Sequence, residues 1–79
     1  MSHLIVVRAT WDLEVKVWTA ESPDLPGLVT EASSLDELDQ KLPGLIQDLM
    51  ENDDDGEMDI PVGVVASFSK RVRVRARAA

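Results

Sequence analysis

The chain has 79 residues, a length typical of one domain, and we therefore expect residues 1–79 to fold as a single unit. The hydrophobic fraction of 44% is that of a globular protein, and the lack of cysteine excludes a disulfide scaffold, a thiolate nucleophile and a sulfur-ligated zinc site. Residues 1–59 hold three basic and fifteen acidic residues, a net charge of −12, whereas residues 60–79 hold five basic residues and no acid. The acidic part attracts basic partners and repels nucleic acid, whereas the basic part attracts nucleic acid and repels basic partners.

The apolar runs and the first residues of the sequence do not predict a membrane segment. The longest apolar runs, Leu4–Val7 and Val62–Ala66, are far shorter than the roughly 20 residues of a membrane span. No secretory signal pattern opens the sequence. We therefore expect a cytoplasmic protein that does not enter a membrane.

The first third of the chain predicts three strands. Residues 4–11 are rich in β-branched residues, and residues 15–20 alternate in the same way, which leaves a three-residue hairpin loop at 12–14. Two prolines and a glycine within residues 22–27 exclude regular structure there. A short third strand is expected over residues 28–32.

The middle of the chain predicts a helix. Ser34 is a good N-cap, and Glu37 three residues later completes a capping box. Leucine and isoleucine then recur at helical spacing up to residue 49. Because Pro43 and Gly44 interrupt a stripe that stays in phase, we expect a kinked helix, or two short helices sharing one face, ending near Met50.

The last third predicts a loop and a strand. Six of the nine residues 51–59 are acidic, which is typical of a solvated loop. Their spacing partly resembles a calcium-binding loop, but the twelfth position is Val62 where a bidentate glutamate is needed. From Ile60 on, the even-numbered residues are apolar, with Lys70 as the exception, and the odd-numbered residues are polar from Ser67 on, which is the pattern of one long strand over residues 60–77.

These elements give the order β-β-β-α-β. We therefore expect an α+β fold with one mainly antiparallel sheet and a helical layer on one face. No catalytic or cofactor site is expected, since the single histidine, His3, lies at the terminus and the four glycines are too dispersed to form a phosphate loop. We likewise expect no metal site and no enzymatic activity.

Residues 11–38 carry a resemblance to a known family. They contain a tryptophan-turn-tryptophan hairpin, then Asp24-Leu25-Pro26-Gly27, an extended segment and the helix start Ser34-Leu35-Asp36-Glu37-Leu38. In this order the segments resemble the HicB antitoxin family, and most closely its short single-domain relatives of unknown function. The resemblance covers most of residues 4–50, and the strand after residue 60 fits it in position.

The resemblance implies a partial RNase-H-like fold and a protein-binding role. HicB proteins neutralise HicA, a small basic RNA-cleaving toxin, by covering its active face. Asp24, Pro26 and Gly27 match the family's turn, where they are expected to set its shape rather than to catalyse. The DNA-binding domain that many HicB proteins carry after this region has no counterpart in residues 1–79.

The basic C-terminal segment leaves two further functions open. Four arginines, Arg71, Arg73, Arg75 and Arg77, recur at period two on one strand face and could track nucleic-acid phosphates. Alternatively, a strand over residues 60–77 is too long for a domain of this size, so residues 70–79 would pair with another copy of the chain. We therefore expect a homodimer or a higher homo-oligomer. The alternatives to the HicB-like protein-binding role are nucleic-acid binding through these arginines and a structural homo-oligomer.

Overall fold

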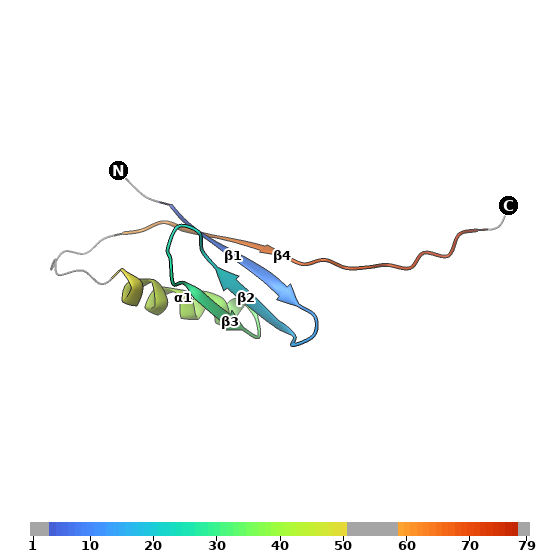
Figure 1. Cartoon of the computed structure of the whole chain (residues 1–79), viewed down its shortest axis with the longest axis horizontal. Helices are drawn as coiled ribbons and strands as arrows, with labels where there is room; N and C mark the ends of the chain where they lie inside the picture. The colour runs from blue at the N-terminus through green and yellow to red at the C-terminus, as the bar shows by residue number, and fades with distance from the viewer. Residues whose placement is uncertain (1–3, 51–58, 78–79) are drawn as a thin grey trace.

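The computed structural model describes residues 4–50 and 59–77. Its elements, in chain order, are β1 (Ile5–Asp12), β2 (Val17–Glu21), β3 (Val29–Ala32), α1 (Leu35–Leu49) and β4 (Val62–Ser67). The strands form one sheet, and α1 lies along one of its faces (Figure 1). The predicted α+β class and the order β-β-β-α-β are therefore confirmed.

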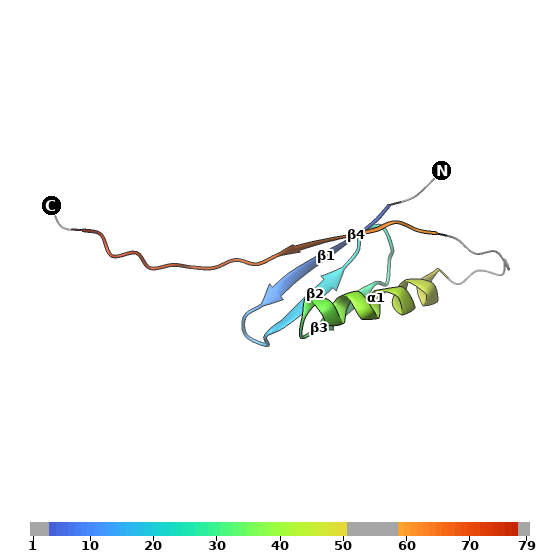
Figure 2. The same cartoon turned by 180° about the vertical axis from the view of Figure 1, so that it is seen from behind.

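The sheet has the strand order β3-β2-β1-β4. The β1–β2 and β2–β3 pairs are antiparallel, as expected for strands joined by short turns, whereas β1 and β4 are parallel. The helix supplies the long connection that returns the chain to the β1 side of the sheet, as Figure 2 shows from behind. As a result β4 is an edge strand, next to the central strand β1.

The first hairpin has a longer loop than we predicted. Residues 13–16 form the loop, and β2 begins at Val17 rather than at residue 15. The Asp12 side chain accepts hydrogen bonds from the amides of Glu14 (2.9 Å) and Val15 (3.3 Å), while the Lys16 amide donates to the Asp12 carbonyl (2.7 Å). Lys16 has a φ of 60°, so a left-handed residue closes the turn without glycine.

The core lies between α1 and the sheet. Alternate residues of β1 point toward the helix, and the helix buries the side of its apolar stripe that carries Leu38, Leu42 and Ile46. The remaining buried apolar residues come from the other two strands of this face and the turn before β3: Ala20, Leu28 and Ala32. Because these side chains come from four separate segments, the core depends on the whole β-β-β-α arrangement.

The helix is a single 15-residue element, although we expected a kink or a break at Pro43. Pro43 is exposed, so its ring lies on the solvent side of the helix, and the stripe on the other side continues through it. The proline removes one backbone hydrogen bond from the helix interior. Packing of the apolar stripe therefore holds the helix together across the proline.

The long final strand is the prediction that the structure contradicts most clearly. The strand β4 ends at Ser67, and residues 68–77 have no regular secondary structure. The ladder with β1 ends at the Thr10–Ser67 pair, two residues before β1 itself ends. Beyond this point the chain runs away from the sheet (Figures 1 and 2), and β1, which ends at Asp12, offers no neighbour to residues 70–77.

Candidate functional site

An aromatic pair on the first hairpin forms the base of an open groove. Trp11 and Trp18 lie directly opposite each other in the β1–β2 ladder, with ring centroids 5.4 Å apart and a tilt of 59°. Trp11 follows Ala9 at period two, and Trp18 precedes Ala20 in the same way, so both rings lie on the helix side of the sheet. Both tryptophans remain half-buried.

The groove extends from this pair to the start of α1 and to the end of β4. Its volume is about 490 Å³, and it opens widely to solvent. We call it the aromatic groove, and its lining residues are Trp11, Trp18, Ser33, Ser34, Leu35, Asp36 and Phe68. Leu35 is 42% exposed and Phe68 is 67% exposed, so the groove presents apolar side chains to solvent. Such a shallow, apolar surface suits an apolar side chain of a protein partner.

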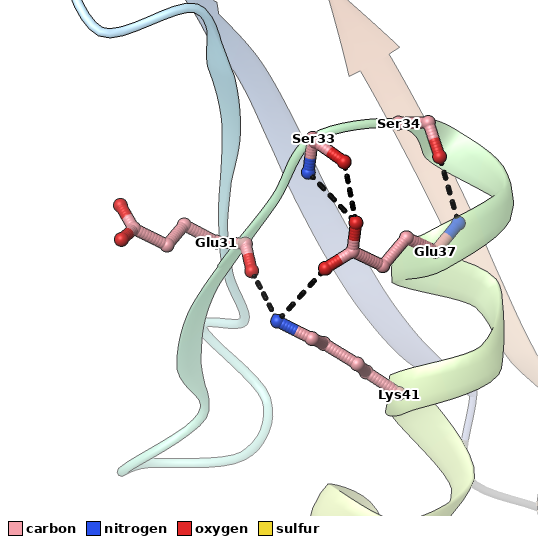
Figure 3. A network of polar contacts seen from close by, with 5 residues as sticks. All are labelled: Glu31, Ser33, Ser34, Glu37 and Lys41. Carbon is pink, nitrogen blue, oxygen red and sulfur yellow. Dashed lines mark hydrogen bonds and ion pairs between the residues drawn. The ribbon is translucent and has the colours of Figure 1, made fainter.

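The rim of the groove is the capped N-terminus of α1, drawn in Figure 3. The Ser34 hydroxyl accepts a hydrogen bond from the Glu37 amide at 3.0 Å, as an N-cap does. The expected return bond of the capping box is displaced by one residue: the Glu37 carboxylate accepts from the amide (3.3 Å) and the hydroxyl of Ser33. This displacement fixes Ser33 and Ser34 together at the groove.

Lys41 extends this network to the sheet. Its Nζ lies 3.3 Å from the Glu37 carboxylate and donates to the Glu31 carbonyl at 2.8 Å, which links α1 to β3 (Figure 3). The hydrogen bonds from Ser33, together with Lys41, hold the pKa of Glu37 below its usual value. The Glu37 carboxylate therefore stabilises the helix N-terminus through its bonds to Ser33 and Lys41.

The turn residues Asp24, Pro26 and Gly27 lie at the other end of the helix. The Asp24 carboxylate accepts a hydrogen bond from the Val6 amide at 2.8 Å. The pairing of β1 with β2 ends at Arg8, so β2 supplies no acceptor for this amide. Gly27 has a φ of 94°, and a Cβ placed there would lie 3.2 Å from Leu49 Cδ2. The turn therefore joins the start of β1 to the end of α1.

The four arginines Arg71, Arg73, Arg75 and Arg77 are exposed and follow the end of β4. The structure thus places the predicted site residues in three separate regions: the turn, the helix cap and the C-terminal segment. Of these predicted residues, only the cap residue Ser34 lines the aromatic groove. Sequence reasoning missed the groove itself, although the tryptophans that flank the hairpin loop were a usable signal, because residues equally distant from a hairpin turn face each other.

Some expectations concern residues outside the described ranges. His3 lies there, and so do residues 51–58, the first eight positions of the loop whose spacing partly resembles a calcium-binding loop. Across residues 4–50 and 59–77, no group of three or more histidine, aspartate or glutamate side chains gathers into a metal site. In the same part of the chain, no helix combines the length and apolar character that crossing a membrane requires.

Comparison with known proteins places the chain in a family. The chain is similar to the hypothetical protein TTHA1013 of the extremely thermophilic bacterium Thermus thermophilus, whose crystal structure is known, with 36% identity and a TM-score of 0.63. The match covers 91% of this chain and 100% of that protein. No curated protein matches the chain. The family described as "Domain of unknown function (DUF1902)" matches residues 4–76, and the chain therefore belongs to this family.

Proposed function

We propose that the chain is a non-catalytic, HicB-like protein-binding module of the cytoplasm, and that the aromatic groove binds a small basic protein. In its most specific form, the partner is a HicA-like RNA-cleaving toxin, which the module neutralises by covering its active face. The observation that supports this proposal best is an exposed apolar groove beside an acidic helix.

The groove supplies the apolar part of such an interface. Tryptophan side chains are enriched where a few residues carry most of the binding free energy. Here two tryptophans pack against each other from adjacent strands, and this contact limits the conformational entropy that is lost when a partner covers them. Phe68 and Leu35 widen the apolar surface on either side.

The surface around the groove supplies the charge. Residues 4–50 carry nine acidic and three basic side chains, a net charge of −6. The only basic side chain of α1, Lys41, is already bound to Glu37 and to the Glu31 carbonyl. The helix therefore presents a net negative surface, with Asp36 in the groove itself. Such complementarity accelerates encounter with a basic partner and disfavours acidic ones.

The polar groups of the groove support a binding role over catalysis. The hydroxyl of Ser34 caps the helix, and the hydroxyl of Ser33 donates to the Glu37 carboxylate. Each hydroxyl is thus engaged by the helix cap. The carboxylate that accepts from Ser33 is itself bound to the Ser33 amide and to Lys41, which lowers the pKa of Glu37 and makes it a weak general base.

The test is inhibition of RNA cleavage. A small basic HicA-like reading frame is expected next to this gene, and its purified product is assayed on RNA with increasing amounts of the chain. We expect stoichiometric inhibition. Replacing Leu35→Ala, which removes an apolar wall of the groove, should weaken inhibition by about tenfold.

The matched control is Leu49→Ala, at the opposite end of the same helix. The two leucines are 42% and 40% exposed, so both substitutions remove the same side chain at a similar degree of exposure. Inhibition by the Leu49 variant should match that of the parent. Equal loss in both variants, or no inhibition by the parent, would count against the groove, and a gene neighbourhood without a basic reading frame would count against the toxin.

A further inference from the structure

The edge strand β4 carries apolar residues that α1 does not cover. Val7 and Val64 are register partners in the parallel β1–β4 pair, so their side chains share the helix side of the sheet. Val7 is fully buried, whereas Val64 is 44% exposed. The same face of β4 and the residue just beyond it present a row that we call the edge strip: Val62, Val64, Ala66 and Phe68. The helix thus leaves one strand of the sheet bare.

The backbone of β4 is also unpaired on its outer side. The Pro61 carbonyl accepts a hydrogen bond from the Ile5 amide, so the odd-numbered backbone groups of β4 face β1. Because these groups alternate along a strand, those of Val62, Val64 and Ala66 point to the free edge. A free edge beside exposed apolar side chains is a template for another strand.

Residues 70–77, which we call the tail, have the pattern of that missing strand. Apolar residues Val72, Val74 and Ala76 continue the even-numbered positions of the edge strip, and arginines occupy the odd positions. Val72 and Val74 are 69% and 79% exposed, and within the described residues no strand pairs with the tail. The tail leads away from its own sheet (Figures 1 and 2), so its apolar face has no cover within the part of its own chain that the structure describes.

Charge favours another copy of this chain as the occupant of the free edge. The tail holds five basic residues and no acid, whereas residues 4–50 carry a net charge of −6. A tail is therefore attracted to the folded part of a second copy. The tail also follows β4 directly in the chain. A two-fold axis between two copies therefore lets the tail of each copy pair with β4 of the other, and both free edges are then paired.

We propose that the tail of each copy pairs as an antiparallel strand with the free edge of β4 in a second copy, with the even-numbered side chains of both strands on the helix side. This register sets Val72 and Val74 beside the edge strip of the other copy. A shift by one residue would set arginines on that apolar face instead. The contact is separate from the aromatic groove, apart from Phe68, which belongs to both.

The first test compares the dimer affinity of two adjacent substitutions by sedimentation velocity over protein concentrations from the low micromolar to the high micromolar range. Val74→Ser and Arg73→Ser create the same side chain on opposite faces of the tail. We expect the parent to dimerise, Val74→Ser to weaken the dimer by roughly tenfold or more, and Arg73→Ser to change it far less. Circular dichroism checks that both variants keep the parent's fold, since the tail lies outside the core.

The second test determines the register by cross-linking, which is direct because the chain has no cysteine. A variant with Ala66→Cys is mixed with single-cysteine variants at positions 70 to 74 and oxidised. Disulfides should form with an even-numbered position and not with 71 or 73, because opposed side chains must lie on one face.

Three results would overturn the proposal. The first is a parent that stays monomeric up to the highest concentration. The second is a dimer that Val74→Ser leaves unchanged or that cross-links through odd positions. The third is self-association only after a single-stranded or double-stranded RNA oligonucleotide is added, which would assign the arginines to phosphates. Failure of toxin binding, in contrast, would leave both tests unaffected, since neither uses the groove.

Discussion

At the scale of single residues, the fold depends on a few side chains that satisfy backbone groups left over by the strands. Asp24 accepts from the Val6 amide where β2 has ended, and it does so across 18 residues of sequence. The Pro-Gly turn could be predicted from its residue types, because proline fixes φ and glycine permits a positive φ. The bond to Val6 could not, because a carboxylate in a turn has many amides within reach.

Gly27 gives the first prediction. Gly27→Ala should lower the free energy of unfolding by about 1–2 kcal/mol, because its φ of 94° strains an L-residue and the new Cβ would lie 3.2 Å from Leu49 Cδ2. Gly44→Ala is the control, since it is helical and has nothing within 4 Å of its added Cβ. That substitution should stabilise by roughly 0.5–1 kcal/mol. Urea denaturation measures both, and equal effects would contradict the strain at Gly27.

Glu37 gives a prediction on pH. Because hydrogen bonds from Ser33 and contact with Lys41 lower the pKa of Glu37 in the folded state, its contribution is complete above the ordinary glutamate value. The contribution is lost as the pH falls through the folded-state pKa. Glu37→Gln should therefore lower the urea midpoint relative to the parent at neutral pH, and this difference should shrink at acidic pH, below the folded-state pKa.

Ser33→Ala serves as the partner variant for this experiment. It removes the hydroxyl that contributes most to the lowered pKa of Glu37. It should reproduce a large part of the pH-dependent loss without changing the charge of the chain. A difference between Glu37→Gln and the parent that is equal at neutral and at acidic pH would show that the carboxylate charge is not what the cap uses.

At the scale of elements, packing overrides local sequence signals. The segment Pro43-Gly44 predicts a break, yet α1 is one helix because Leu42 and Ile46 bury the same face on both sides of it. In the first hairpin, the loop length follows from the left-handed Lys16 rather than from a turn-forming glycine. Local propensity could not reveal the unbroken helix, since it depends on packing against the sheet, and it favours glycine rather than lysine at a left-handed position.

Leu38 tests the packing of α1 against the sheet. Its side chain is 1% exposed at the centre of the core between α1 and the sheet, so Leu38→Asp places an unpaired carboxylate there. The cost, about 4 kcal/mol or more, approaches the whole stability of a small domain. We expect no cooperative thermal unfolding transition by circular dichroism. Gln40→Asp, on the exposed side of the same helix, should melt near the parent, and a normal transition for Leu38→Asp would contradict the packing of α1.

The final strand shows where an alternating pattern stops being informative. Alternation through residue 77 states which face each residue would occupy in a sheet, but not whether a neighbouring strand exists. Within one chain, β1 ends at Asp12, which in this register would lie opposite residue 69, so residues 70–77 have no neighbour in β1. The parallel pairing of β1 and β4 was also not predictable, because the side of the sheet to which α1 returns the chain depends on packing.

At the scale of the whole molecule, the acidic folded part and the basic tail occupy different regions of space. The chain measures 71 × 27 × 19 Å along its principal axes, and the tail extends well beyond the sheet and α1 along the long axis in Figure 1. The acidic folded part carries the groove at one end of the helix, while the basic tail projects from the sheet edge. We infer that these surfaces serve two different partners, a basic protein at the groove and a second copy at the edge.

The most direct test of the groove uses its own tryptophans. Trp11 and Trp18 are the only tryptophans of the chain and both line the groove, so their emission reports on its occupancy. The chain is titrated at low and at high salt with a variant of the HicA-like protein in which any tryptophan of that partner is replaced by phenylalanine. The account predicts a saturable blue shift of the emission, with a weaker affinity at high salt and for Leu35→Ala but not for Leu49→Ala. Binding that leaves the tryptophan emission unchanged, or no binding at either salt concentration, would contradict it.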